Sequence, residues 1–346
     1  MFYLEFVTAI SSEAGMSLLD QTPLSVLDLA PIRQGESAGD ALADSVALAQ
    51  KADALGYHRY WLAEHHNIDG IASAATSVLI GHVASQTERI RVGSGGIMLP
   101  NHAPLVIAEQ FGTLNALHPG RIDLGLGRAP GSDGATMRAL RRDPFAGVED
   151  FPERLAELRR YLGTPAPGQR IRAVPGQNSH VPVWLLGSSG YSARLAGQLG
   201  LPFVFAAQFA PAHLKEALAL YRRAFCPSEV LDEPYAMVGL PVIVAESDAY
   251  AHYLNTTAQQ KFLNLHRGRS TQSLPPVEHI DWTPREQAAV AQNLGAAVVG
   301  EPERVREGLE AFLQQTGANE LMVVTDVYDR EDRLRSLELL AELCRG

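Results

Sequence analysis

Cysteine is scarce in this sequence, and its scarcity limits what the protein can be. The 346 residues include two cysteines, Cys226 and Cys344, whose spacing fits neither a zinc site nor a disulfide framework. Such sparse cysteine is typical of a protein kept in a reducing compartment. Long apolar runs are also absent, since none reaches the roughly 20 residues that a membrane helix needs. The sequence therefore predicts a cytoplasmic protein without a metal site or a membrane span.

Basic residues are also few. The chain carries 29 Lys and Arg against 39 Asp and Glu, which gives a formal net charge of -10. Nucleic acid and anionic membrane surfaces are bound by clustered Lys and Arg, and the densest basic group, Arg138, Arg141 and Arg142, is equally explained by a solvated loop. We therefore predict a small-molecule substrate, with no nucleic acid and no membrane as partner.

The first residues do not form part of the predicted domain. Residues 1–16 contain no basic residue, although a signal peptide begins with positive charge. We interpret 1–16 as a disordered or artefactual N-terminal extension and 17–346 as one folded domain.

Short apolar runs alternate with helical patterns along this domain. Eight strands with interleaved helices favour a closed (β/α)8 barrel, the TIM barrel, over an open α/β sheet. The helices are predicted at 40–55, 74–86, 104–117, 152–161, 192–199, 212–225, 302–315 and about 330–343. The strands are predicted at 24–30, 60–63, 90–93, 122–126, 183–186, 203–205, 237–244 and 321–324.

One segment interrupts the alternation. Residues 246–297 follow the seventh predicted strand and are too long for an ordinary βα loop. Because they leave the carboxyl end of a barrel strand, they would overhang the face on which barrel active sites lie. Long loops of this kind are usually functional lids or disordered, so we predict an inserted lid segment here.

Residues suited to chemistry follow three neighbouring strands. The carboxyl ends of parallel barrel strands line one face, so these residues should meet at one pocket. They are Glu64-His65-His66 after the second strand, Ser94-Gly95-Gly96 after the third, and Gly127-Arg128 at the end of the fourth.

These segments resemble the motifs of the bacterial luciferase-like flavin-dependent monooxygenases. The resemblance runs from about Ser17 to the C-terminus and implies a TIM barrel, reduced FMN from a separate flavin reductase, oxygen as co-substrate and a homodimer. It includes Glu64-His65-His66, the segments 93–100 and 120–128, Leu185-Leu186-Gly187-Ser188-Ser189, and Gly300-Glu301-Pro302-Glu303. The Ala- and Ser-rich second helix, 74–86, would allow close packing in such a dimer or against the barrel.

His65 is the predicted catalytic residue. Imidazole has an ordinary pKa near neutrality, which suits a general acid or base, and the resemblance places the matching histidine close to the reactive edge of the flavin. The alternative is a strand-end histidine satisfied by a backbone carbonyl. We interpret His66 as structural, because adjacent residues on a strand point to opposite faces. A metal bound at Glu64-His65-His66 is disfavoured, because no third ligand has helpful spacing.

The remaining predicted site residues would bind the cofactor. The resemblance implies a non-proline cis peptide at Gly95-Gly96 beneath the flavin ring; the alternative is a strand that ends in a tight turn. A guanidinium fork at Arg128 and the free backbone N–H groups that begin a helix suit a phosphate. Asp28 and His102 lie near the same face. The predicted cofactor-binding residues are Gly95, Gly96, Gly127, Arg128, Leu186, Gly187, Ser188, Ser189 and Tyr191.

We therefore predict an FMN-dependent monooxygenase or oxidoreductase that acts on a small organic substrate. Gly127 stands where some members of the resembled family carry a reactive cysteine, so no thiol is expected beside the flavin. Two alternatives stay open. One is an oxidoreductase of the same fold that uses the deazaflavin F420 for hydride transfer, and the other is a flavin-binding protein without turnover.

Overall fold

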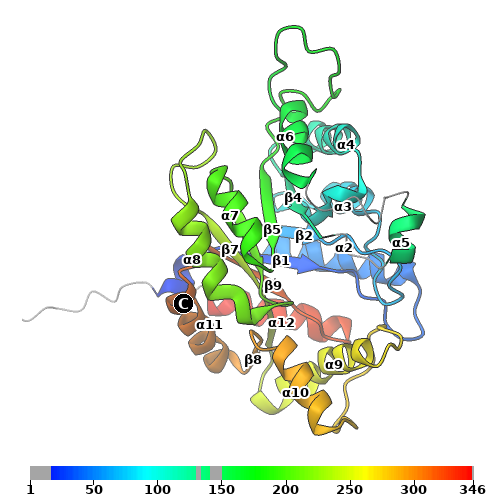
Figure 1. Ribbon diagram of the computed structural model, residues 1–346. Helices are drawn as coiled ribbons and strands as arrows, with labels where there is room; N and C mark the ends of the chain where they lie inside the picture. The colour runs from blue at the N-terminus through cyan, green and yellow to red at the C-terminus, as the bar shows by residue number, and fades with distance from the viewer. Residues whose placement is uncertain (1–16, 130–133, 141–149, 345–346) are drawn as a thin grey trace, which may run out of the picture.

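A computed structural model describes residues 17–129, 134–140 and 150–344 (Figure 1). The predicted extension at 1–16 and the basic residues Arg141 and Arg142 lie outside the described residues.

Eight parallel strands close into a barrel, as predicted. Each strand pairs with its neighbours in the order β1-β2-β3-β4-β5-β6-β7-β9, and β9 pairs back with β1. The barrel strands are β1 (Leu24–Asp28), β2 (Arg59–Leu62), β3 (Arg91–Met98), β4 (Ile122–Gly127), β5 (Val183–Gly187), β6 (Phe203–Ala206), β7 (Ala236–Val244) and β9 (Glu320–Val324).

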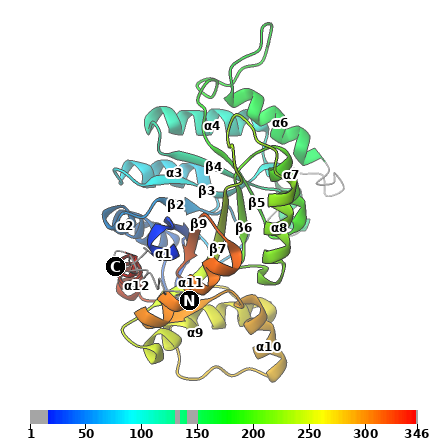
Figure 2. The same ribbon diagram turned by 90° about the vertical axis from the view of Figure 1, so that its left-hand side faces the viewer.

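Helices surround these strands, with α9 and α10 set apart on one side (Figure 2). Local signals fix their ends: α2 begins at a capping box formed by Ser37 and Asp40 and stops at Gly56, which adopts a left-handed conformation with φ 81. The helices are α1 (Leu18–Gln21), α2 (Ala38–Leu55), α3 (Thr76–Ser85), α4 (Pro104–Leu117), α5 (Gly134–Ala139), α6 (Phe151–Leu162), α7 (Gly190–Gln198), α8 (Leu214–Ala224), α9 (Asp248–His266), α10 (Pro284–Asn293), α11 (Pro302–Thr316) and α12 (Arg330–Leu343). In the part of the chain that the structure describes, no helix has the length and apolar character needed to cross a membrane.

Alternate residues of each strand face two different layers, as the pleat requires. On β2, Tyr60 and Leu62 pack in the large cluster between barrel and helices, whereas Trp61 packs in a separate cluster within the barrel. The Trp61 ring meets Trp184 edge to face, with ring centres 5.4 Å apart, an arrangement that contributes about 0.5 to 1.5 kcal/mol beyond area burial. The barrel interior is therefore a packed core.

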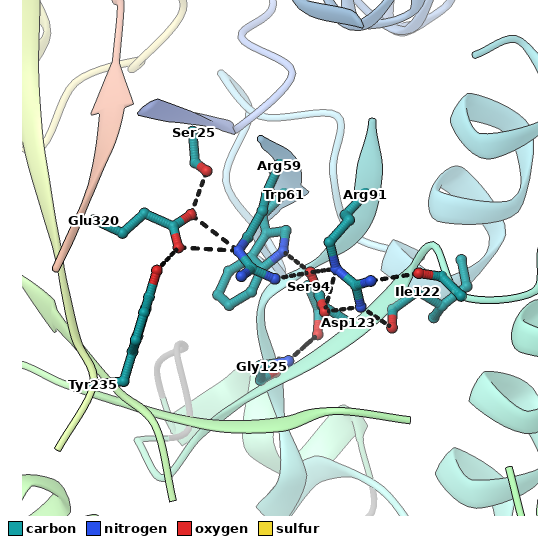
Figure 3. A network of polar contacts seen from close by, with 11 residues as sticks. Ser25, Arg59, Trp61, Arg91, Ser94, Ile122, Asp123, Gly125, Tyr235 and Glu320 are labelled. Carbon is teal, nitrogen blue, oxygen red and sulfur yellow. Dashed lines mark hydrogen bonds and ion pairs between the residues drawn. The ribbon is translucent and has the colours of Figure 1, made fainter. Parts of the chain in front are cut away.

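A buried polar network crosses the barrel at the amino ends of the strands (Figure 3). Arg59, the first residue of β2, donates to Asp123 of β4 at 2.7 Å and to Glu320 of β9 at 2.9 Å. Both carboxylates are completely buried. Glu320 also accepts from Ser25 and Tyr235, and Asp123 from Arg91 and Trp61. The network lies at the end of the barrel opposite the one that carries His65.

The segment after β7 differs from the predicted loop. It contains helices α9 and α10 and a short strand, β8 (Val298–Gly300), which pairs with the end of β7. A small apolar cluster that includes Leu263, Ile280 and Val290 stabilises it. Backbone hydrogen bonds of Ser273 with Ile32 and Gln34 attach it to the loop after β1. The insertion is therefore folded over the carboxyl face, while its movement as a lid remains a prediction.

Candidate active site

His65 lies just beyond the carboxyl end of β2. Its backbone N–H donates to the carbonyl of Ser73 at 3.0 Å, which fixes the turn after the strand. The imidazole lines a cavity and makes no hydrogen bond to any residue that the structure describes. Burial, with help from Lys261, lowers the pKa of His65 to about 4. The neutral-range pKa expected from the sequence is therefore wrong, and His65 is an uncharged imidazole at physiological pH.

Glu64 and two further imidazoles form a separate cluster beside His65. The Glu64 carboxylate is buried and accepts from His66 at 2.8 Å, from His102 at 2.9 Å and from the backbone of Met98 at 2.9 Å. Burial raises the pKa of Glu64, but these hydrogen bonds, led by that of His102, bring it below its ordinary value. The cluster joins the end of β2 to the end of β3, which gives His66 and His102 structural contacts.

Gly95 and Gly96 lie within β3, which continues to Met98 and does not end before the glycines as predicted. Their peptide bond is cis. A Cβ at Gly95 would lie 2.7 Å from Cδ1 of Leu27, and a Cβ at Gly96 would lie 2.8 Å from the carbonyl oxygen of Gly125. Packing inside the barrel therefore requires glycine at position 96, where the obstacle is backbone, whereas a Cβ at position 95 would displace the Leu27 side chain. A role beneath a flavin remains a prediction.

Arg128 and the start of α7 come together at the ends of β4 and β5. The guanidinium carbon of Arg128 lies 4.1 Å from the centre of the Tyr191 ring. Among the described residues, no carboxylate pairs with Arg128. Ser188 and Ser189 are exposed, and the N-cap Ser189 makes no side-chain cap hydrogen bond. Free N–H groups at a helix start, beside a guanidinium that no described carboxylate pairs with, are suited to bind an anion.

Two further predicted cofactor-binding residues, Gly127 and Gly187, lie where a side chain would clash with its neighbours. A Cβ at Gly127 would lie 2.6 Å from the sulfur of Met98, and a Cβ at Gly187 would lie 2.7 Å from Cβ of Ser192. Leu186 is half-buried at the end of β5 and packs against the cluster inside the barrel. Glycine at 127 and 187 thus permits the close approach of β3 to β4 and of β5 to α7.

The cavity beside His65 has a volume of about 160 Å³ and extends toward the insertion. Its walls are mainly apolar, and Phe209 and Leu265 remain half or more exposed on its lining, at 51% and 59%. The apolar lining consists of Leu29, Pro31, Ile68, Ile71, Phe209, Pro241, Ala258, Phe262, Leu265, Leu294 and Val324. A cavity of this kind suits a small, largely apolar ligand.

Asp28 does not line this cavity, although the sequence placed it near the same face. It is completely buried at the end of β1 and accepts from Arg333 at 2.9 Å and from Tyr60 at 2.6 Å. Burial raises the pKa of Asp28, but attraction to Arg333 together with hydrogen bonds from Ser45, Tyr60 and Arg333 brings it below its ordinary value. The cavity is lined by Arg333, whose orientation Asp28 fixes.

Polar residues of the cavity were missed by sequence reasoning. Lys261 of α9 pairs with Asp326, just beyond β9, at 3.0 Å, and Gln208 follows β6. One weak signal existed, because Lys261 is one of only three lysines in the chain and lies in the insertion. Nothing in the sequence brings it to Asp326. Within the described residues, no group of three His, Cys, Asp or Glu side chains is arranged to hold a metal ion.

Comparisons with known proteins agree with this geometry. A sequence model of the family described as luciferase-like monooxygenase matches residues 22–320. The chain is 54% identical over 321 residues to a luciferase-like monooxygenase of Escherichia coli (strain K12), covering 92% of this chain and 96% of that one. It is 34% identical to the N-acetyl-S-alkylcysteine monooxygenase of Bacillus subtilis (strain 168), covering 92% and 97%.

Solved structures give the same fold. The crystal structure of apo-MsnO8 has a TM-score of 0.84 and 38% identity, covering 93% of this chain and 98% of that one. An FMN complex of the oxygenating constituent of 3,6-diketocamphane monooxygenase from Pseudomonas putida has a TM-score of 0.72 at 19% identity, covering 93% and 97%. An F420-dependent secondary alcohol dehydrogenase has a TM-score of 0.70 at 15% identity, covering 94% and 100%. At these identities the last two share the fold alone, and the fold accommodates either cofactor.

Proposed function

Since the chain belongs to the luciferase-like monooxygenase family and is an oxidoreductase, we propose that it oxidises a small organic substrate with oxygen and reduced FMN. One observation carries the choice of FMN: the guanidinium of Arg128, which pairs with no carboxylate among the described residues, stacks on Tyr191 beside the free N–H groups that begin α7. This arrangement suits a terminal phosphate, which FMN carries and riboflavin lacks. A separate flavin reductase supplies the reduced cofactor.

The chemistry of the described residues suits FMN. Arg128, the backbone from Gly187 to Tyr191 and the hydroxyls of Ser188 and Ser189 would hold the phosphate, and Gly95-Gly96 with Leu186 would contact the ring. When bound, reduced FMN supplies two electrons, so that one oxygen atom passes to the substrate and the other leaves as water.

The protein itself orients the substrate, excludes water from it and moves a proton. The apolar cavity keeps bulk water from the reacting atoms. His65 enters the reaction uncharged, because burial holds its pKa at about 4, and a neutral imidazole has a ring nitrogen that can accept a proton. The insertion that carries α9 closes over the substrate. A flavin-binding protein without turnover has no need of an apolar cavity lined by His65.

Anaerobic titration tests the cofactor. Reduced FMN should bind more tightly than F420 and more tightly than reduced riboflavin. Admission of oxygen with aldehydes, alkanes, sulfonates and N-acetyl-S-alkylcysteines then tests for an oxygenated product. The last class joins the panel because a relative that is 34% identical is named for it. Tighter F420 binding would reassign the cofactor, and FMN binding without product from any compound would favour the non-catalytic alternative.

The protein also assembles as a homodimer in this proposal, through the faces of α3 and α4. Val78 of α3 and Val106 of α4 are exposed apolar side chains, at 73% and 43%. Ala74 and Ala75, just before α3, are exposed as well, whereas Ala84 is buried against the barrel. Sedimentation should therefore show a dimer at micromolar concentration, and Val78→Lys should shift it to monomer without lowering the melting temperature.

A further inference from the structure

The polar part of the cavity wall includes a lysine and aspartate pair. The ammonium of Lys261 lies 3.0 Å from one carboxylate oxygen of Asp326, and the two side chains are 16% and 18% exposed. An ammonium has three N–H donors, and Asp326 takes one of them. The other carboxylate oxygen, Oδ1, is buried and accepts no hydrogen bond from any residue that the structure describes. The pair thus offers donors and an acceptor side by side.

The charges around the cavity cancel. Lys261 pairs with Asp326, and Arg333 pairs with the buried Asp28 at 2.9 Å. His65, the remaining titratable residue of the lining, is uncharged at neutral pH. A carboxylate or an ammonium that entered the cavity would find no unpaired charge of opposite sign. Because burying an uncompensated charge is costly, the wall favours an uncharged ligand.

Gln208 adds a second polar contact on the same lining. Its side chain is 8% exposed, and its Oε1 has no hydrogen-bond partner among the described residues. A Cβ at position 239 would lie 2.5 Å from this oxygen, so Gly239 on β7 leaves the room that the amide occupies. A carboxamide can both donate and accept, so Gln208 can bond either a donor or an acceptor of the ligand.

We propose that the cavity binds an uncharged, mainly apolar substrate that carries a cis secondary carboxamide, as in a lactam ring, which presents its C=O and N–H on the same side. The substrate carbonyl accepts from Lys261, and the substrate N–H donates to Asp326. An ionised carboxylate only accepts hydrogen bonds, so Asp326 selects a donor, and the apolar walls receive the alkyl parts. This inference rests on the proposed function in one respect, since it takes the cavity beside His65 as the substrate site.

A matched pair of probes tests the donor. The lactam 6-butylpiperidin-2-one and the lactone 6-butyloxan-2-one have the same number of heavy atoms, and the lactone, a cyclic ester, replaces the amide N–H with oxygen. Calorimetric titration of the full-length protein, with and without FMN, should show the amide binding about tenfold more tightly, the lower end for a hydrogen bond to a charged group. In Asp326→Ala the ratio of amide affinity to ester affinity should fall to one or below. Glu246→Ala, which removes an exposed carboxylate paired with Arg335, should leave it unchanged.

Three results would overturn the proposal. They are equal affinity for amide and ester in the unmodified protein, an unchanged preference in Asp326→Ala, and tighter binding of nonanoate than of the amide, which would make Lys261 a carboxylate site. If Asp326→Ala does not fold, Asp326→Asn keeps the side-chain shape and should reduce the ratio by roughly threefold, because a neutral acceptor is weaker.

The FMN affinity of the same samples separates this proposal from the proposed function. Asp326→Ala should bind FMN as the unmodified protein does, because the phosphate site lies on β4, β5 and α7. If FMN binds and the amide shows no preference, only this inference fails. If FMN does not bind while Asp326 still selects the amide, the proposed function fails and the ligand class stands.

Discussion

The guanidinium carbon of Arg128 lies 4.1 Å from the centre of the Tyr191 ring, and this contact joins the end of β4 to the first turn of α7. Stacking of this kind holds the plane of the guanidinium and leaves its N–H groups at the edges. Because no described carboxylate pairs with Arg128, those donors are available to an anion.

Replacing Arg128 should weaken FMN binding far more than riboflavin binding. Arg128→Ala removes a charged donor from the phosphate, so FMN affinity should fall by about 1.5 to 3 kcal/mol, while riboflavin affinity changes little. Arg128→Lys keeps the charge without the planar fork and should give an intermediate loss. Fluorescence titration measures both ligands, and equal losses for FMN and riboflavin would remove Arg128 from the phosphate site.

The low pKa of His65 should make stability depend on pH. In the unfolded chain His65 has its ordinary pKa of 6.5, whereas in the folded protein the pKa is about 4. Between these values the unfolded state binds the extra proton, so stability falls as pH falls. The unmodified protein should lose unfolding free energy between about pH 7 and about pH 4. In His65→Asn this loss should be smaller by on the order of 1 to 3 kcal/mol. Urea unfolding at each pH measures the free energy. If His65→Asn and the unmodified protein lose the same amount, the pKa of His65 is not lowered in the folded protein.

Replacing the two adjacent histidines should have different effects: mainly on activity for His65 and mainly on stability for His66. His65→Ala should keep the fold and FMN affinity while slowing product formation by about 10²-fold, the low end of the usual contribution of a general acid or base, because a group with a pKa of about 4 is a weak base at neutral pH. His66→Ala removes a hydrogen bond to buried Glu64, so it should lower the melting temperature and change turnover less. Single-turnover rates and melting curves of both variants test this prediction. If folded His66→Ala loses turnover and His65→Ala does not, His66 is the catalytic histidine.

Much of the fold follows from local signals that the sequence displays. Gly56 ends α2 in the left-handed conformation that glycine favours, and apolar runs such as 237–240 are buried on both faces. The end of β3 was misplaced because glycines are poor strand formers, whereas barrel packing keeps Gly95 and Gly96 in the strand. Helix α10 had a visible capping box, Thr283 with Glu286, which the prediction of a loop overlooked.

The site was only partly predictable. Strand ends place His65 and Arg128 on one face, because parallel strands share a direction. The pKa of His65 depends on burial and on Lys261, which only the folded chain reveals. The pairing of Lys261 with Asp326 joins residues 65 positions apart through the docking of α9. No local pattern encodes such a contact.

Gly127 should resist even the smallest side chain. A Cβ there would lie 2.6 Å from the sulfur of Met98, so Gly127→Ala should cost about 1 to 3 kcal/mol of unfolding free energy, as overpacking does. Gly127→Ala combined with Met98→Ala removes the clash and should cost less than the two single changes added together. Gly134→Ala is the control, because its Cβ would meet no described atom nearer than 3.7 Å. Additive costs in the double variant would mean that Met98 is not the obstacle.

The polar network at the opposite end of the barrel should support stability and leave the site unaffected. Glu320→Ala leaves the buried Arg59 with Asp123 as its remaining carboxylate partner, and breaking a buried pair in this way costs about 3 to 5 kcal/mol. Glu246→Ala breaks an exposed pair with Arg335 and should cost about 1 kcal/mol or less. Because the network lies at the amino ends of the strands, FMN affinity of the folded Glu320→Ala protein should be unchanged. Chemical unfolding and FMN titration of both variants test this. A small stability cost for Glu320→Ala would mean that Asp123 alone satisfies Arg59, and a loss of FMN affinity would mean that the network shapes the carboxyl face.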